Sequence, residues 1–414
     1  MLKGFENFET MFATSIGLES PWRIEKAEYD EESKSVHIYV ASDKNTRYPC
    51  PKCGELHPRF DNEEERVWQH GDVVFFPCYV HCRRPRIKCG KCDKIHVVTA
   101  PWARERSRYT LLFEAYSMLL AEKLPIEQAR QFLRISHTSL TNIVAYWVGK
   151  RVAEDDLSEV TDLNIDETSF KKGQSYVTVV CDAAARRVID VEEGRTAQQV
   201  WDFSLKLEEK GGDCNKIKQV ASDMSSAYLK GINDCFPNAT TVIDKFHVKQ
   251  VLLNAMQEVR WEEQGKEARN RKAGRKLLMI PEGRMTDQQI EKVQELSRKY
   301  PKTGRAFRMV QSLDVMYACY TSEEADQRFK QLVSWLKRSR LEPMKRAAAT
   351  LLEHKTQIMA YFFTRLTNAI AEGINSLIQA GKRKARGFRT FRGYSTMIYL
   401  TCSKLDFAPI QLFA

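Results

Sequence analysis

The run DLNIDET at residues 162–168 predicts a β-strand that ends in acidic side chains. Further strand-like runs follow at 175–182 (SYVTVVCD), 187–192, 217–222 and 240–243. A helical pattern occupies 197–209, and a short helix precedes the last of these strands. The region 160–258 therefore contains three strands, a helix, a strand, a helix and a strand, which predicts an α/β domain.

Acidic residues stand at the ends of three of these strands. Asp166 belongs to the first, and Asp223 and Asp244 directly follow the fourth and the fifth. The element order is that of a ribonuclease-H-like sheet, in which the first strand and the strand after the first helix lie side by side. Asp166 and Asp223 are then neighbours that can share metal ions. Glu167 points to the other face of its strand and is the weaker candidate.

A third acid is expected from a later helix. The run TNAIAEGINS at 367–376 places Asn368, Glu372 and Asn375 on one helix face. The opposite face carries Ile370, Ile374 and Leu377. Taken singly, each acid has a plainer interpretation, as a strand-end cap or as a solvated side chain.

The acids together indicate a particular chemistry. Clustered carboxylates ionise together only where cations neutralise them. Two Mg²⁺ (or Mn²⁺) ions roughly 3.5–4 Å apart would activate the attacking oxygen and stabilise the leaving oxygen of a displacement at phosphorus.

Two C-x-x-C turns, CPKCG at 50–54 and CGKC at 89–92, predict one structural zinc ion. The expected ligands are Cys50, Cys53, Cys89 and Cys92. Strand-like runs at 73–76 and 79–83 favour a zinc β-ribbon with a long hairpin. Cys78 and Cys82 share a strand face and are expected to be core thiols, although the sequence leaves open whether either joins the zinc site. The alternative is a metal-free, redox-active or merely buried set of thiols.

A helix-turn-helix unit is predicted between the two regions. A helical run at 124–133 is followed by a short break, and a second helix covers 137–148 with Ser136 as its N-cap. The second helix would offer short polar side chains to base edges or phosphates: His137, Thr138, Ser139, Thr141 and Asn142. An ordinary helical hairpin is the alternative, and the sequence of the unit alone does not separate the two.

The charge balance favours a polyanionic partner. The chain has 65 Lys and Arg against 54 Asp and Glu, a net charge of +11. Two basic runs are candidates for DNA contact: 266–276 (KEARNRKAGRK) and 382–392 (KRKARGFRTFR). In the second run Phe388 and Phe391 are interleaved as possible base-stacking residues. Its cationic side chains are Lys382, Arg383, Lys384, Arg386, Arg389 and Arg392.

No window reaches the roughly 18 apolar residues that a membrane-spanning helix needs, and no secretory signal is recognisable at the N-terminus. We therefore expect a cytoplasmic protein whose eleven cysteines are reduced.

The length of 414 residues predicts more than one domain, and the expected class is multidomain α+β. We expect an N-terminal β-ribbon with the zinc site at 1–104 and the helix-turn-helix domain at 105–155, with 153–159 as a linker. The ribonuclease-H-like catalytic domain would begin at 160–258, be interrupted by an all-α insertion at 259–365, and end with a C-terminal helix and basic tail at 366–414.

These motifs resemble those of the DDE transposases of the bacterial insertion-sequence group ISL-three, over nearly the whole chain. The resemblance rests on the two cysteine turns and the helix-turn-helix, on IDETS at 165–169 and ASDM at 221–224, and on DKFHV at 244–248 and EGIN at 372–375. It implies that Asp166, Asp223 and Glu372 are the DDE triad and that Asp244 and His247 form a D-x-x-H motif. His247 would then touch the scissile phosphate or the leaving group, or it would only hold Asp244; both remain open.

Three positions depart from the pattern of the group. Ser225 stands where a tryptophan is usual, Arg134 replaces a glycine common in the helix-turn-helix turn, and Ala369 replaces the glycine of an Asn-Gly pair. None of the three is a proposed metal ligand, so an active enzyme is still expected.

The resemblance implies a DNA transposase that binds terminal inverted repeats, hydrolyses a phosphodiester at the element end and transfers the freed strand to target DNA. Pairing of two double-stranded ends implies a homodimer on DNA, located with the bacterial nucleoid. The alternatives are a catalytically inactive DNA-binding regulator derived from a transposase, and a related metal-dependent nuclease that cleaves without joining.

Overall fold

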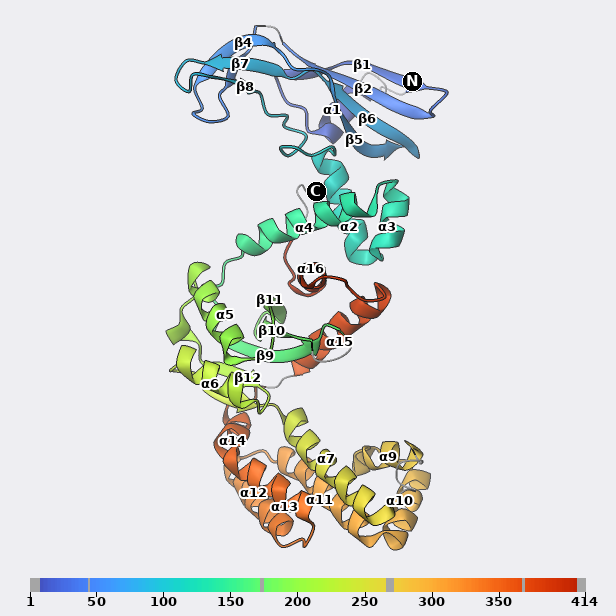
Figure 1. The fold of residues 1–414 in the computed structure, drawn as a ribbon, viewed down its shortest axis with the longest axis vertical. Coiled ribbons are helices and arrows are strands. Elements are labelled where there is room, and N and C mark those ends of the chain that lie inside the picture. The colour runs from blue at the N-terminus through green and yellow to red at the C-terminus, as the bar shows by residue number, and fades with distance from the viewer. Residues whose placement is uncertain (1–7, 44, 172–174, 266–271, 367–368, 408–414) are drawn as a thin grey trace, which may run out of the picture. The chain divides into compact units, whose positions relative to one another are not determined.

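The computed structural model describes residues 8–43, 45–171, 175–265, 272–366 and 369–407. The chain divides into two compact units (Figure 1). Unit 1 comprises residues 1–152 and 405–414, and unit 2 comprises residues 153–404. The division falls at the start of the polar stretch 153–159.

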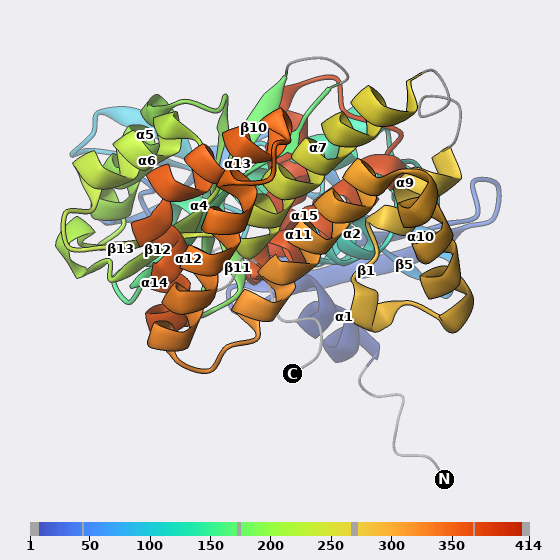
Figure 2. The same ribbon diagram turned by 90° about the horizontal axis from the view of Figure 1, so that it is seen from below.

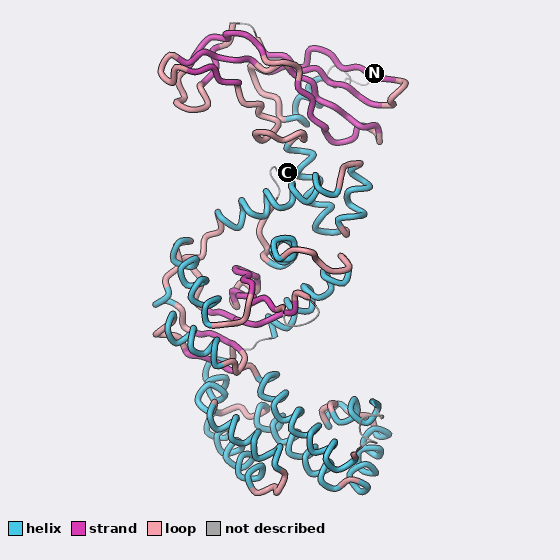
Figure 3. Tube along the Cα trace, viewed as in Figure 1, coloured by secondary structure: helices cyan, strands magenta, loops and turns pink. Residues whose placement is uncertain are grey.

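Unit 1 contains two four-stranded sheets, coloured magenta in Figure 3. The first has the order β1-β2-β6-β5, with β1 Trp22–Asp30, β2 Ser35–Ser42, β6 Phe76–Cys82 and β5 Arg66–Val73. The second has the order β3-β4-β7-β8, with β3 Arg47–Pro49, β4 Leu56–Asn62, β7 Pro85–Cys89 and β8 Lys94–Val97. The expectation of a strand at 73–76 was wrong: Val73 pairs with Phe76, so Val74 and Phe75 form the two-residue turn between β5 and β6.

The described part of unit 1 also contains the helices α1 Phe8–Ile16, α2 Leu111–Lys123, α3 Ile126–Leu133 and α4 His137–Ala153. Ser136 caps α4 as expected, because its hydroxyl accepts a hydrogen bond of 3.0 Å from the Ser139 N–H. The turn before α4 places Arg134 at a φ of 55°, in the left-handed conformation that glycine adopts most readily.

A buried carboxylate ties the helices of unit 1 together. Glu114 on α2 has no exposed surface. Its oxygens accept hydrogen bonds from the Arg104 guanidinium at 2.9 Å, the Ser107 hydroxyl at 2.6 Å and the Trp147 indole at 2.7 Å. These bonds hold the segment before α2 and the helix α4 in one arrangement, since two donors come from that segment and the third from α4.

Unit 2 contains a five-stranded sheet in the order β11-β10-β9-β12-β13. Its strands are β11 Arg187–Glu193, β10 Tyr176–Asp182, β9 Asp162–Ser169, β12 Gln219–Ser222 and β13 Thr240–Ile243. The first three run antiparallel, and β12 and β13 run parallel to β9. The expected adjacency of the first strand and the strand after the first helix is therefore observed.

Helices cover both faces of this sheet. Leu163 and Ile165 of β9 point toward α5 Ala197–Glu209 and α6 Ser226–Cys235, in a core that includes Phe203 and Tyr228. The other face packs against α15 Ala369–Lys384 and α16 Phe391–Cys402. Side chains alternate along a strand, so Asn164, Asp166 and Thr168 face α15. A short 3₁₀ helix, η1 Cys214–Lys216, precedes β12.

The described residues between β13 and α15 form helices joined by loops. Figure 2 shows helices of this region lying side by side. The helices are α7 Lys245–Gln264, α9 Lys272–Leu278, α10 Asp287–Lys299, α11 Pro301–Tyr317, α12 Ser322–Lys337, α13 Glu342–Glu353 and α14 Lys355–Thr364, with the 3₁₀ helix η2 Glu282–Arg284. Helix α7 begins directly after Asp244 and crosses the expected boundary at 258. Helix α14 packs on β13, and Ala360 shares a small core with Ala221 and Val242.

In the described part of the chain, no helix combines the length and the apolar character needed to cross a membrane.

Candidate active site

The parallel pairing of β9, β12 and β13 brings three acids to neighbouring positions. Ala221 pairs with Asn164, so two residues further along Asp223 lies beside Asp166. Ser222 pairs with Ile243, and the next residues are Asp223 and Asp244. Three carboxylates that are far apart in the sequence therefore lie on adjacent strands.

Asp166 is the most buried acid of the presumed triad, with 7% of its surface exposed. One carboxylate oxygen accepts a bond of 2.8 Å from the Glu167 N–H, and the other accepts one of 2.9 Å from the Asn375 amide. Burial raises the pKa of Asp166 to about 6, although the Glu167 N–H and His247 act in the opposite direction; the charge of Asp223 adds to the rise. Burial therefore disfavours the ionised form of this carboxylate.

Asp244 and His247 form a pair at the start of α7. Asp244 is 4% exposed, and its carboxylate lies 3.3 Å from Nδ1 of His247. Burial lowers the pKa of His247, but the bond to Asp244 and the charge of Asp166 outweigh it, so the pKa is raised. A hollow of about 210 Å³ is lined by Asp223, Met224, Ser225, His247, Gln250, Val251 and Asn254. Gln250 and Asn254 were not expected in the site, and only their spacing along α7 after His247 could have indicated them.

Helix α15 is attached to β9 by a row of side-chain bonds. Asn375 bonds Asp166, Gln379 bonds the Thr168 hydroxyl at 2.7 Å, and Lys382 bonds the Ser169 carbonyl at 2.7 Å. Of these three helix residues, only Asn375 was expected from the sequence on the face that carries Glu372. Within the described residues the buried Oδ1 of Asn375 has no hydrogen-bond partner.

Glu372 lies one turn before Asn375 and is exposed. Its pKa is raised by partial burial and by the charge of Asp244, whereas His247 acts in the opposite direction. Asn368 lies outside the described residues. On the expected apolar face, Ile374 lies in the core and Ile370 packs against it, which confirms those two positions. The expectation for Leu377 was wrong, since 58% of it is exposed; Ile378, four residues after Ile374, faces the core in its place.

The acids are near one another but not in contact as a group. Among the described residues, no three of them have ligand oxygens that all lie within 4.8 Å of one another. Glu167, as expected, faces away from this set and lies 3.6 Å from the Arg195 guanidinium. The oxygen-rich donor set is of the kind that suits Mg²⁺ or Mn²⁺, because hard cations prefer carboxylates.

A second candidate site is formed by the two C-x-x-C turns of unit 1. The four sulfurs of Cys50, Cys53, Cys89 and Cys92 all lie within 4.8 Å of one another. The Cys50 and Cys92 sulfurs are 4.0 Å apart, and the Cys53 and Cys89 sulfurs are 3.6 Å apart. Thiolates about 2.3 Å from a tetrahedral zinc ion would be about 3.8 Å apart, so the cluster could hold zinc.

Cys78 and Cys82 lie outside this group and are buried in β6. Burial raises the pKa of each thiol to about 12, which fits core thiols. Glu55, His57 and Cys89 form another group with ligand atoms within 4.8 Å.

The side chains expected to contact DNA are exposed to different degrees. At the start of α4, His137, Thr138 and Asn142 are exposed, while Ser139 and Thr141 are partly buried. In the basic tail Lys382 is engaged with Ser169, and the remaining cations are exposed: Arg383, Lys384, Arg386, Arg389 and Arg392. Most of the basic run 266–276 lies outside the described residues.

Phe388 and Phe391 were considered as base-stacking residues, but both pack against the core of unit 2. The ring of Phe388 lies 5.5 Å from that of Tyr394, and the ring of Phe391 lies 6.4 Å from that of Phe170. Their aromatic surface is thus used within the fold.

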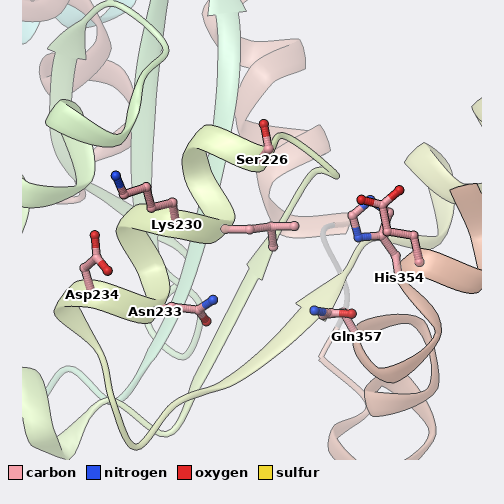
Figure 4. A pocket seen from close by; sticks show the side chains of 8 residues that line it. Ser226, Lys230, Asn233, Asp234, His354 and Gln357 are labelled. Carbon is pink, nitrogen blue, oxygen red and sulfur yellow. The ribbon is translucent and has the colours of Figure 1, made fainter.

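A larger hollow of about 430 Å³ lies between α6 and the helices α13 and α14 (Figure 4). Lys230 and Asp234 line it from one side and His354 and Gln357 from the other. It shares no lining residue with the hollow beside Asp223. The hollow beside Asp223 is the better candidate for catalysis despite its smaller volume, because its lining residue His247 is acted on by the charges of Asp166, Asp223 and Asp244.

The chain is similar to known proteins along nearly its whole length. A family model described as "Transposase" matches residues 163–398, and one described as "Helix-turn-helix domain of transposase family ISL3" matches residues 98–148. The transposase for insertion sequence element IS1557 of Mycobacterium tuberculosis is 24% identical over 425 residues, covering 94% of this chain and 95% of the relative. The transposase for insertion sequence element IS1001 of Bordetella parapertussis is 24% identical over 384 residues, covering 91% and 94%.

Proposed function

Because the chain belongs to the ISL3 (ISL-three) family of transposases, we propose that Asp166, Asp223 and Glu372 are its catalytic carboxylates. The observation that carries this proposal is the convergence of β9, β12 and α15. Asp223 follows the strand beside Asp166, and the Asn375 bond fixes α15 against the same carboxylate. Glu372 lies on that helix, one turn away.

These carboxylates would hold two Mg²⁺ (or Mn²⁺) ions. Bound there, the ions would supply positive charge to the attacking and leaving oxygens of a phosphodiester. The raised pKa of the buried Asp166 supports this role, since a neighbouring cation would stabilise its ionised form.

The reaction has two displacements at phosphorus. In the first, water attacks at the element end, a new P–O bond forms, and the bond to the 3′ oxygen breaks to leave a 3′-hydroxyl. In the second, this hydroxyl attacks a target phosphodiester, and a target 3′ oxygen leaves. Each step exchanges one P–O bond for another, so neither an oxidant nor a covalent enzyme intermediate is needed.

We propose that Asp244 and His247 assist at the same centre. Asp244 holds Nδ1 of His247, and the ring lines the hollow beside Asp223, so Nε2 would be the nitrogen that acts there. A protonated imidazole would interact with the scissile phosphate or the leaving oxygen. If it does neither, its bond would serve only to hold Asp244.

The remaining parts of the chain fit this function. The strand order of unit 2 supports a ribonuclease-H-like catalytic domain at 160–258 and 366–414 with an all-α insertion at 259–365. The four-sulfur cluster supports a zinc ribbon within residues 1–104, and the structural ion would be Zn²⁺ held by Cys50, Cys53, Cys89 and Cys92.

DNA recognition would be shared among separate elements. We propose that exposed residues of α4 within the helix-turn-helix domain at 105–155 contact the terminal inverted repeats, and that the cations at 383–392 contact phosphates. Two ends must be processed together, so a homodimer on double-stranded DNA is proposed, in the cytoplasm where the element DNA lies.

The test uses purified protein, Mg²⁺ and labelled duplexes made from the DNA that flanks its own coding sequence. Wild type is expected to cleave the end and join it to a second duplex, whereas Asp166→Asn, Asp223→Asn and Glu372→Gln are expected to bind the duplex without cleaving it. Glu167→Gln is the matched control, because it alters the adjacent acid that faces Arg195, and it should retain activity.

Each other outcome has a defined meaning. Activity that survives all three triad changes rejects the site. Cleavage without joining favours a nuclease, and end-specific binding by a wild type that neither cleaves nor joins favours a regulator.

A further inference from the structure

The two-residue turn between β5 and β6 contains residues that are unusual for its backbone conformation. Val73 and Phe76 pair, so the turn has only two central residues, Val74 and Phe75. Both have positive φ, 49° and 71°. Two-residue turns with this conformation favour Asn-Gly, and a β-branched valine at positive φ is strained.

The strained turn presents apolar side chains to solvent. Val74 is 76% exposed and Phe75 is 87% exposed. Neither side chain gains burial that would offset the strain. Strain combined with exposed apolar surface is characteristic of a contact site for a partner.

The turn is fastened to the helix-turn-helix. We call residues 72–76 the β5–β6 tip. Arg134, in the turn between α3 and α4, forms a 3.0 Å ion pair with Asp72 and donates a 3.2 Å hydrogen bond to the Phe75 carbonyl. Earlier on β5, the side-chain amide of Gln69 donates a hydrogen bond of 3.2 Å to the carbonyl of Leu133, the last residue of α3. Figure 1 shows β5 and β6 ending beside α3.

Arg134 therefore has a role that a glycine could not have. The left-handed turn conformation would suit glycine, but only a long guanidinium side chain reaches the tip. In this chain the arginine at this position therefore joins the α3–α4 turn to the tip.

We propose that the β5–β6 tip is a second DNA-contacting element, which inserts Phe75 and Val74 into the groove next to the one that receives α4. This proposal rests on the proposed binding of element ends by the helix-turn-helix. Apolar side chains that reach the minor groove insert between base steps and unstack them. The tip is continuous with the α3–α4 turn and lies outside the region 98–148 that matches the family's helix-turn-helix model.

Duplex DNA is the occupant favoured by this location. The exposed His137 and Thr138 begin α4 directly after the α3–α4 turn to which Arg134 bonds the tip, whereas the charge of Arg134 is balanced by Asp72. A second copy of the chain is the alternative occupant, and the experiment separates the two.

The test replaces the turn by its favoured residues in the full-length chain, Val74→Asn with Phe75→Gly. The hairpin should fold at least as well, because Asn-Gly suits the turn. Affinity for end DNA, measured by fluorescence anisotropy, is expected to fall roughly 10-fold, as for loss of one stacked aromatic contact. The single change Phe75→Leu keeps an apolar side chain at the tip and should retain most of the wild-type affinity. Val67→Thr, at an exposed apolar position of β5 outside the tip, is the control.

A second readout reports insertion directly. With 2-aminopurine placed at successive steps of the end duplex, wild type should increase the fluorescence at one step, and the Asn-Gly variant should not. Unchanged affinity and no fluorescence difference between the two proteins would overturn the proposal. Loss of self-association with unchanged DNA binding would assign the tip to a second copy and would also overturn it. A wild type that shows no preference for end DNA would instead defeat the proposed function, independently of the tip.

Discussion

Replacing Asp166 by asparagine should stabilise the metal-free protein at neutral and higher pH. The carboxylate is buried, and its pKa is raised from 3.8 to about 6, chiefly by burial. The folded state therefore holds the proton more tightly than the unfolded state, and wild type loses stability as the pH rises from the unfolded pKa through the folded one. An asparagine never ionises, so it avoids this loss.

The magnitude follows from the two pKa values. A separation between 3.8 and about 6 corresponds to about 3 kcal/mol once both states are ionised. Relative to the variant, the cost to wild type should be small near pH 4 and grow to about 3 kcal/mol near pH 8. The amide of the new asparagine also has partners. Its oxygen can accept from the Glu167 N–H, and its NH₂ can donate to Oδ1 of Asn375 after the side-chain amide of Asn375 rotates by half a turn.

The assay is chemical denaturation in a chelator at a series of pH values, followed by the same series with Mg²⁺. The variant should be the more stable protein near pH 8, and Mg²⁺ should raise the stability of wild type alone, since only wild type keeps the ionised ligand. Asp182→Ala is the control: Oδ1 of this buried acid accepts two backbone N–H bonds, and losing that acceptor should destabilise at every pH. An Asp166→Asn protein that is less stable than wild type at pH 8 in chelator would refute the reasoning.

Three further outcomes are expected. Metal analysis should find about one zinc ion per chain. Cys82→Ser should retain the ion, whereas Cys53→Ser should lose both the ion and the sheet β3-β4-β7-β8, because Cys53 belongs to the sulfur cluster and Cys82 does not. Asn375→Ala should slow end cleavage about 10-fold or more while DNA affinity stays constant, because the carboxylate of Asp166 loses a donor; an unchanged single-turnover rate would contradict this. Glu114→Gln should lower the unfolding free energy by about 3 kcal/mol or more, because the Arg104 charge loses its buried partner, and denaturation monitored by tryptophan fluorescence measures it.

Much of unit 2 could be predicted from its sequence, because local pattern and topology agree there. The helix expected at 197–209 is observed with the same bounds, and the strands before Asp223 and Asp244 end where their acids begin. Parallel pairing of β9 and β12 follows from element order, so the proximity of Asp166 and Asp223 was accessible without coordinates.

Other features depend on long-range contacts that no local pattern encodes. The run at 73–76 has strand composition, yet pairing of Val73 with Phe76 makes its centre a turn. Phe388 and Phe391 are interleaved with cations in sequence, but the core of unit 2 recruits both rings. In the sequence, Arg134 only weakens the helix-turn-helix pattern. Its bonds to Asp72 and to the Phe75 carbonyl, which join the turn to the tip, depend on the tertiary structure.

The row of bonds between α15 and β9 explains how Glu372 can be delivered from so distant a part of the chain. Seven helical residues separate Asn375 from Lys382, a rise of about 10.5 Å, and three strand residues separate Asp166 from Ser169, a rise of about 10 Å. The two rises match, so the helix runs beside the strand in register. Extended back by three residues, about 4.5 Å, the same register brings Glu372 level with the stretch between Asn164 and Asp166. The sheet positions two acids through strand pairing and the third through this helix, while the exposure of Glu372 leaves room for cations and DNA to complete the site.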